Sequence, residues 1–186
     1  MVRTLQTKGR PIVLIGLMGS GKSTIGRELS RRTALPFLDM DAVIEEQVGK
    51  TIPDIFREKG EGHFRALETA LLRLIENNVK NGHGAHIIST GGGVVLRPEN
   101  RAILQRLGFT VWLNVDVPNL LARTARTHNR PLLQVDDREA AFRALLAERS
   151  PLYTQSSHLR INSSDMKVQE VVDTVLHHAQ RFFKRL

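Results

Sequence analysis

Eight residues near the N-terminus have the types and the spacing of a phosphate-binding loop. They match the pattern G-x-x-x-x-G-K-[ST] and read Gly16-Leu17-Met18-Gly19-Ser20-Gly21-Lys22-Ser23. Glycines here let the backbone curl so that successive N–H groups point into one concavity, and a following helix adds its positive N-terminal end. Lys22 can then reach the outer phosphates of a nucleotide, and the Ser23 hydroxyl can bind Mg²⁺.

A glycine-rich turn that happens to precede a lysine is the alternative interpretation of this segment. The flanking residues argue against it, because an apolar run at 12–15 predicts a short buried strand before the loop. A predicted helix from Lys22 to about Thr33 follows the loop. The segment is therefore interpreted as a phosphate loop.

A pair of carboxylates, in Asp39-Met40-Asp41, forms a second chemical signal. In an extended segment residues i and i+2 point the same way, so both side chains could face the phosphate loop. One carboxylate could hold Mg²⁺ through water, and the other could accept a proton from an attacking hydroxyl. The alternative is that Asp41 caps a helix beginning at Ala42, and the residue types leave both interpretations open.

Three arginines and a glycine run are the remaining candidates. Arg65 follows an apolar-stripe residue, and the alternative is an exposed arginine or an i,i+3 partner of Glu68. The run Gly91-Gly92-Gly93 ends a predicted strand and indicates close backbone approach to a ligand, although a flexible turn is the alternative. Arg130 lies in a predicted lid loop at about 126–137, which could close over phosphates. Arg149 lies near a predicted helix end, where a helix-dipole role is the alternative.

The elements that must position these groups alternate between strand and helix. Apolar runs predict strands at 12–15, 36–38, 86–89, 109–115 and 158–162. Helical spacing and capping residues predict helices at 22–33, from 51, and at 63–80, 98–107, 118–127, 138–150 and from 168. The first strand should be buried on both faces, whereas the polar alternation of the fifth suits a sheet edge.

This alternation predicts a single α/β domain over residues 1–186, with residues 1–10 frayed. The expected architecture is a P-loop three-layer sandwich, in which a five-stranded parallel sheet is flanked by helices and carries the lid loop. In such sheets ligands bind beyond the carboxyl ends of the strands. We therefore expect the phosphate loop, the two aspartates and the glycine run to surround one crevice.

Composition narrows the function classes. The chain has no cysteine, which excludes disulfides and thiolate chemistry, and no run of about 18 apolar residues that a membrane helix would need. The N-terminal segment has no secretory pattern, so we expect a cytoplasmic protein with no membrane partner. We also expect a monomer. The net charge is +8, but basic residues are spread along the chain and aromatic residues are only 5%, so we expect no nucleic-acid partner.

Taken together, these segments resemble the shikimate kinase family, which belongs to the nucleoside-monophosphate-kinase-like group of P-loop folds. The phosphate loop identifies only the superfamily, whereas the combination of DxD, GE-x-x-FR-x-x-E and GGG is much more specific. The matching pieces span nearly the whole chain: GLMGSGKST at 16–24, FLDMD at 37–41, IEEQVGKTIPDIF at 44–56, GEGHFRALE at 60–68, STGGGVV at 89–95, RPLL at 130–133 and ERSPLY at 148–153.

The resemblance implies an enzyme that uses ATP and Mg²⁺ to phosphorylate the 3-hydroxyl of shikimate, giving shikimate 3-phosphate and ADP in aromatic amino-acid biosynthesis. It implies that Lys22 contacts the transferred phosphoryl group. It also implies that Ser23 binds Mg²⁺ and that Asp39 orders the water molecules around this ion. The ATP phosphates would be bound by the loop residues Met18, Gly19, Ser20, Gly21, Lys22, Ser23 and Thr24.

The resemblance also implies roles at the substrate. Asp41 would hold the substrate hydroxyls and act as general base, and Arg65 and Arg149 would clamp the carboxylate. Arg130 would be the lid arginine, and Arg123 would lie against adenine. Backbone contacts to the substrate would come from Gly91, Gly92 and Gly93. The family's adenine loop after the fifth strand often carries an arginine, whereas residues 162–166 here contain none.

Two other functions remain open from the sequence. One is a gluconate kinase or a nucleoside-monophosphate kinase on the same scaffold. The other is a kinase-like domain that binds its ligand without turnover and acts as a sensor or a nucleic-acid regulator. An enzyme is favoured by the presence of Lys22, Ser23, Asp41 and Arg130. A domain that only binds its ligand has no need for all the groups that would bind phosphate, metal and proton during phosphoryl transfer.

Overall fold

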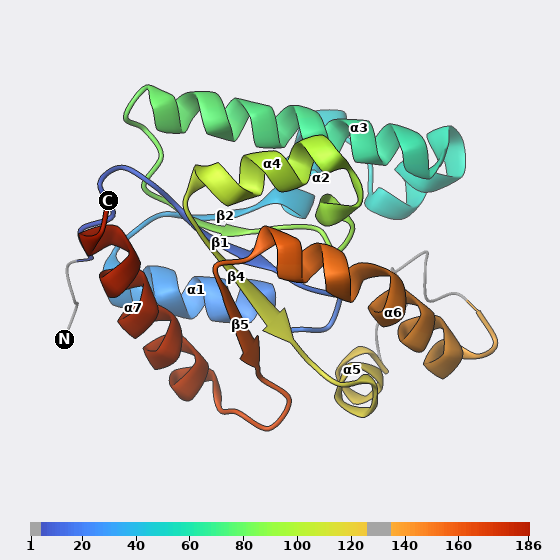
Figure 1. Ribbon diagram of the computed structural model, residues 1–186. Coiled ribbons are helices and arrows are strands. Elements are labelled where there is room, and N and C mark those ends of the chain that lie inside the picture. Colours follow the sequence, from blue (N-terminus) through green and yellow to red (C-terminus); the bar gives the residue numbers. More distant parts are fainter. Residues whose placement is uncertain (1–4, 126–134) are drawn as a thin grey trace.

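Five parallel strands form one sheet in the computed structural model, which describes residues 5–125 and 135–186 (Figure 1). The strand order is β2-β3-β1-β4-β5. The strands are β1 (Ile12–Ile15), β2 (Phe37–Asp39), β3 (Ile87–Ser89), β4 (Phe109–Asn114) and β5 (Leu159–Asn162). The predicted fold class is confirmed.

Helices cover both faces of this sheet (Figure 1). The helices α1 and α7 pack on one face, whereas α2, α3, α4 and α6 pack on the other. Their bounds are α1 (Lys22–Thr33), α2 (Met40–Val48), α3 (Ile52–Lys80), α4 (Pro98–Leu107), α5 (Val117–Thr124), α6 (Arg138–Ser156) and α7 (Val168–Lys184), with a short 3₁₀ helix η1 (Val94–Leu96). Among the described residues, no helix has the length and apolar character required to cross a bilayer.

The central strand β1 is buried on both faces, as its apolar sequence predicts. Val13 and Ile15 enter the core beneath α3 and α4, and Ile12 and Leu14 enter the core beneath α1 and α7. Alternate side chains of a strand point to opposite faces, so an unbroken apolar run fits a strand covered on both sides.

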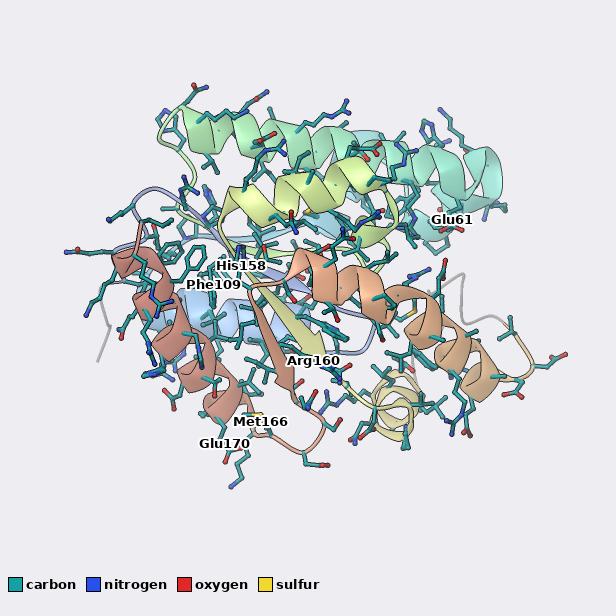
Figure 2. All side chains as sticks on the ribbon, viewed as in Figure 1. Glu61, Phe109, His158, Arg160, Met166 and Glu170 are labelled. Carbon is teal, nitrogen blue, oxygen red and sulfur yellow. The ribbon has the colours of Figure 1, made fainter. Side chains whose placement is uncertain are left out.

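The last strand, β5, lies at the sheet edge, as its polar alternation predicts. Ile161 is buried, whereas its neighbours along the strand are partly or fully exposed. Arg160 points outward, and its guanidinium lies 4.5 Å from the centre of the Trp112 ring (Figure 2). A charged side chain at this position discourages pairing of the edge with another chain.

Strand register brings the functional segments to one edge of the sheet. Ser89 of β3 aligns with Leu14 of β1 on one side and with Asp39 of β2 on the other. The three strands therefore end at the same level. The segments that follow them, which carry the phosphate loop, the aspartates and the glycine run, begin side by side.

Three local predictions about the helices need correction. The helix α2 begins directly after β2, and its N-cap is Asp39, which accepts a hydrogen bond from the Asp41 amide, so the cap interpretation of Asp41 is wrong. The predicted Thr51 cap is confirmed, but the two helices predicted from 51 and at 63–80 are one helix, α3, which bends at Gly60, whose φ of 77° ordinary residues rarely adopt. The helix α6 continues through Pro151 to Ser156. Arg149 is therefore inside this helix and has no dipole role at its end.

The N-terminal segment also differs from the prediction. Leu5 and Thr7 are buried, and Leu5 joins the core beneath α1 and α7. The prediction of a frayed segment is thus wrong for residues 5–10. Residues 1–4, Arg130 and most of the predicted lid, residues 126–134, lie outside the described residues.

Replacing Gly108 by Ala should destabilise the fold without reaching the candidate site. A Cβ at Gly108 would lie 2.1 Å from the Pro11 carbonyl oxygen, where β4 begins beside β1. We expect the free energy of unfolding to fall by about 1–3 kcal/mol, measured by urea denaturation. The control is Gly62→Ala in α3, where a Cβ meets no atom within 4 Å. Equal stability of the two variants would contradict this close approach.

Candidate active site

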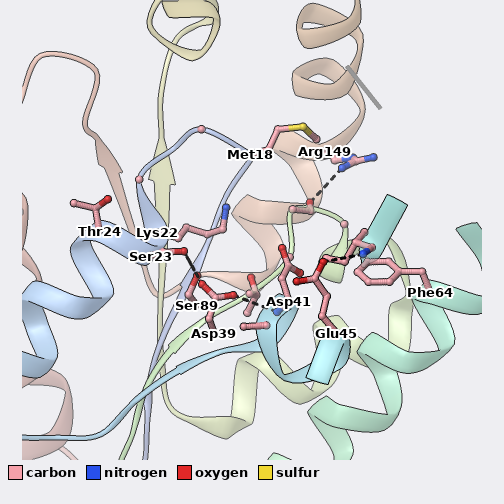
Figure 3. Close-up of a pocket in the computed structure, with 18 of the residues that line it drawn as sticks. Met18, Lys22, Ser23, Thr24, Asp39, Asp41, Glu45, Phe64, Ser89 and Arg149 are labelled. Atoms are coloured by element: carbon pink, nitrogen blue, oxygen red, sulfur yellow. Dashed lines mark hydrogen bonds between the residues drawn. The ribbon is translucent and has the colours of Figure 1, made fainter. Parts of the chain in front are cut away.

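A cavity of about 560 Å³ lies beyond the carboxyl ends of β1, β2 and β3 (Figure 3). It brings together nearly all the residues predicted from sequence: Met18, Gly19, Gly21, Lys22, Ser23, Thr24, Asp39, Asp41, Arg65, Gly91, Gly92, Gly93, Arg123 and Arg149. Ser20 is buried within the loop and does not line the cavity. Arg130 lies outside the described residues.

The phosphate loop curls around the side chain of its own lysine. Lys22 is only 8% exposed, and its Nζ donates hydrogen bonds to the carbonyl oxygens of Gly16 and Leu17, both at 2.9 Å. The N-cap of α1 is Gly21, so no side chain caps the first N–H groups of this helix. An uncapped helix N-terminus next to a buried ammonium is a strong site for an anion.

Oxygen atoms gather at the inner end of the loop. The Ser23 hydroxyl donates to Asp39 Oδ2 at 2.6 Å, and its oxygen lies 3.3 Å from the Ser89 hydroxyl. Hydroxyl and carboxylate oxygens are the donors that Mg²⁺ prefers, and it usually keeps water and phosphate as its other ligands. The described residues contain no larger cluster of carboxylates or imidazoles that could hold a metal ion. The donor set therefore fits a Mg²⁺ ion held partly by a nucleotide.

Arg65 is buried and lines the same cavity as this loop. Its Nη1 donates to Glu68 Oε2 at 2.5 Å, while Nε and Nη2 donate to Glu61 Oε1 at 3.0 and 2.8 Å. A Cβ at Gly93 would lie 2.2 Å from the Arg65 guanidinium carbon. The predicted pairing with Glu68 is present, but the exposed alternative is wrong, because Arg65 is buried and lines the cavity.

Glu68 is an acid that the sequence indicated only as a partner of Arg65. It is fully buried, and its Oε1 has no hydrogen-bond partner among the described residues. Burial raises the pKa of Glu68 to about 7; the Arg65 charge opposes this shift and the Asp41 charge adds to it. The i,i+3 spacing from Arg65 was the only sequence signal for this residue.

Two side chains of α6 hold the middle glycine of the run. Arg149, which is 3% exposed, donates from Nη1 to the Gly92 carbonyl oxygen at 3.3 Å. The Tyr153 hydroxyl donates to the same oxygen at 2.5 Å, and its ring stacks on Trp112. Burial raises the pKa of the Tyr153 phenol, so this hydroxyl remains a donor. Sequence reasoning missed Tyr153, although its position one helical turn after Arg149 is the signal that could have identified it.

Arg123 of α5 borders the outer part of the cavity. Its Nη2 donates to the backbone carbonyl oxygens of Ser163 at 3.2 Å and Ser164 at 2.9 Å. These contacts fix the guanidinium against the loop that follows β5. Because that loop has no arginine of its own, Arg123 is the cation that the described structure places there.

The phosphate loop with Lys22, two buried arginines and the acid Asp41 therefore line one cavity. The loop with Lys22 suits a polyphosphate, and the buried guanidinium groups of Arg65 and Arg149 suit a planar anion such as a carboxylate. Asp41 lies between Ser23 and Phe64 in the close-up (Figure 3). This geometry can bring a phosphoryl group to a hydroxyl of a small acid.

Comparison with known proteins adds an independent finding. The family model described as shikimate kinase matches residues 18–180. A shikimate kinase of Xanthomonas euvesicatoria is 46% identical over 160 residues, which cover 86% of each chain. One from Symbiobacterium thermophilum is 41% identical over 171 residues, covering 91% of this chain and 95% of the relative. The solved shikimate kinase from Acinetobacter baumannii in complex with shikimate is similar with a TM-score of 0.85 at 37% identity, covering 91% and 92% of the two chains.

Replacing Glu68 by Gln should remove a pH-dependent loss of stability. The folded pKa of Glu68, about 7, exceeds its ordinary value of 4.5, so its stabilising contribution is fully present below the lower value and lost as the pH rises through the higher one. Between about pH 5 and about pH 8, the wild type should lose ~1–3 kcal/mol more unfolding free energy than Glu68→Gln. Urea denaturation at each pH measures both.

Glu61→Gln is the matched control for this comparison. It also removes a carboxylate bonded to Arg65, but the Glu61 side chain is 43% exposed. We expect its stability to follow that of the wild type with pH. If the wild type and Glu68→Gln had the same pH dependence of stability, the pKa of Glu68 would not differ between the folded and the unfolded protein.

Proposed function

Because the chain belongs to the shikimate kinase family, we propose that its cavity transfers the γ-phosphoryl group of ATP to the 3-hydroxyl of shikimate. The products are shikimate 3-phosphate and ADP, in the biosynthesis of aromatic amino acids. The observation that carries this proposal is the placement of the phosphate loop and two buried arginines on one cavity. A nucleotide and a carboxylate-bearing acceptor are the ligands that such a loop and such arginines can hold.

The nucleotide would bind at the phosphate loop, with residues 18–24 around its phosphates. Lys22 would exchange its hydrogen bonds to Gly16 and Leu17 for bonds to the outer phosphates. Such an exchange leaves the ammonium paired in both states, which limits the cost of its burial. The N-terminal end of α1 would add its backbone N–H groups.

Ser23 and Asp39 would hold Mg²⁺, the first directly and the second through water. The hydrogen bond between these two side chains supports this assignment, because it brings a hydroxyl and a carboxylate together beneath the phosphate site. When bound, the ion neutralises charge on the phosphates. Asp39 keeps its second oxygen on the Asp41 amide, which fixes the start of α2.

The acceptor would bind at the other end of the cavity. Arg65 and Arg149 would clamp the shikimate carboxylate, and the backbone of Gly91-Gly92-Gly93 would line one side. Asp41 would hold the hydroxyls and accept the proton of the attacking one as general base. The support for the clamp is the deep burial of both guanidinium groups, since a desolvated cation attracts an anion strongly.

Two further arginines would complete the nucleotide site. Arg123 would lie against adenine, which is supported by its fixed position on the loop after β5. Arg130 would close over the phosphates as a lid arginine, a role that rests on its sequence alone. We further propose that the protein acts as a monomer, because residues of one chain line the whole cavity. The proposal also keeps the sequence-based expectations of a cytoplasmic location and of no nucleic-acid or membrane partner.

A comparison of acceptors tests the proposed function. With ATP and Mg²⁺, coupled ADP release should be fast with shikimate and at background level with gluconate or AMP, because neither supplies the carboxylate and hydroxyl geometry expected here. Lys22→Ala should lose at least ~100-fold in turnover, whereas Lys80→Ala, a change at an exposed lysine of α3, should not. Faster turnover of gluconate or AMP than of shikimate would contradict the assignment.

The carboxylate clamp predicts a selective effect of Arg149→Ala. Losing a buried charge-assisted contact should raise the KM for shikimate by about 10–100-fold while leaving the KM for ATP nearly unchanged. Arg143→Ala, six residues earlier in the same helix, is the control, because that side chain does not line the cavity, is 66% exposed and pairs with Glu139. A raised KM for ATP instead would place Arg149 at the nucleotide.

A further inference from the structure

Glu68 lies directly behind the acceptor end of the cavity. Its Oε2 accepts the Arg65 hydrogen bond, and its Oε1 lies against Gly91 with no hydrogen-bond partner among the described residues. A Cβ at Gly91 would be 2.3 Å from Glu68 Oε1 and 2.8 Å from Asp41 Oδ1. Two carboxylates therefore crowd the same side of a glycine that lines the cavity.

A bound acceptor carboxylate would enter a group that already contains several acids. Arg65 and Arg149 face the buried Glu68 together with Asp41. Each arginine also pairs with a further acid, Arg65 with Glu61 and Arg149 with Glu148.

The acceptor would therefore add a negative charge beside Glu68, in a region where charge is costly to bury. Tyr153, which also faces this group from α6, is a neutral phenol because burial raises its pKa, so it brings no compensating charge.

We infer that Glu68 takes up a proton from solvent when the acceptor carboxylate binds to Arg65 and Arg149. This inference rests on the proposed function and names a proton-linked step within it. The proton goes to Oε1, because Oε2 already accepts from Arg65. No other bond forms or breaks, and the proton comes from water or buffer. Glu68 is thus a positioning residue, which acts on the acceptor through Arg65.

The surroundings of Glu68 single it out among the nearby acids. Glu61 bonds the same arginine but is 43% exposed, so solvent compensates its charge. Glu68 is fully buried, and its pKa of about 7 lies close to neutral pH. The charged groups that face it are Arg65 on its own helix, Asp41 from α2 and Arg149 from α6. An added anion among them raises the pKa further, so protonation follows binding.

Proton uptake makes substrate affinity depend on pH with a definite sign. The protein binds the acceptor carboxylate more tightly when Glu68 is protonated. The affinity is therefore highest below the pKa that Glu68 has in the protein without shikimate. Above that pH, Glu68 must be protonated on binding, and this becomes less favourable as the proton concentration falls. The Kd for shikimate should therefore rise as the pH increases above neutrality.

Isothermal titration calorimetry on the full chain tests this. Shikimate is titrated near pH 7.5 in two buffers of different ionisation enthalpy, and the difference in heat gives the protons taken up. We expect about half a proton per shikimate for the wild type, and a Kd that rises several-fold between about pH 7 and about pH 8.5. Glu68→Gln should show no uptake and a flat Kd. Glu61→Gln should keep the wild-type proton uptake and the wild-type rise of the Kd with pH, whatever its absolute Kd.

Buffer-independent heats in the wild type, or uptake that persists in Glu68→Gln, would overturn the inference and leave the kinase assignment intact. Absence of both shikimate binding and shikimate turnover in the wild type would instead remove the proposed function. If Glu68→Gln fails to fold, ¹³C NMR of the Glu carboxyl carbons in the wild type decides. One buried carboxyl should titrate at higher pH with shikimate than without, and unchanged titration curves would overturn the inference.

Discussion

The register of three neighbouring parallel strands is the constraint on which the site depends. Leu14, Ser89 and Asp39 lie at one level across β1, β3 and β2, so the segments that follow them start from a common edge. Packing on both faces fixes this register, because a slip of one residue would turn each buried side chain to the wrong face. The phosphate loop, the aspartates and the glycine run meet for this reason, although they are far apart in sequence.

The cations of the cavity are held in place before any ligand arrives. Lys22 bonds to carbonyl oxygens of its own loop, Arg65 to Glu61 and Glu68, and Arg149 to the Gly92 carbonyl. Each contact pays for burial of a positive charge and fixes its direction. A ligand anion then replaces or shares partners that are already present, so little reorganisation accompanies binding. This preorganisation is the property that phosphoryl transfer requires most from a protein.

The sequence predicts the elements whose signals are local. The apolar run of β1, the Thr51 cap of α3 and the loop with Lys22 each carry their own pattern, and the structure has them as expected. Asp39 and Asp41 could not be distinguished in this way, because an aspartate suits a helix cap and an ion site equally. Asp39 in fact bonds both the Ser23 hydroxyl and the Asp41 amide, so the two interpretations are compatible.

Contacts between distant segments account for what the sequence does not predict. Pro151 suggests a helix end, because a proline removes a hydrogen bond and crowds the preceding turn, yet α6 continues to Ser156. That continuation brings Tyr153 to Gly92, 61 residues earlier in the chain. The burial of Glu68 likewise depends on Gly91 and on side chains of other helices. A local sequence pattern does not predict contacts between residues so far apart in the chain.

A crystal structure of the full chain with ADP, Mg²⁺ and shikimate would show whether the two ligands share this cavity. The shikimate carboxylate should lie within hydrogen-bond distance, about 3 Å, of both Arg65 and Arg149. The 3-hydroxyl should face Asp41, with the ADP phosphates in the loop around Lys22. Shikimate bound with its carboxylate away from both arginines, or ADP bound outside the loop, would contradict the proposed function.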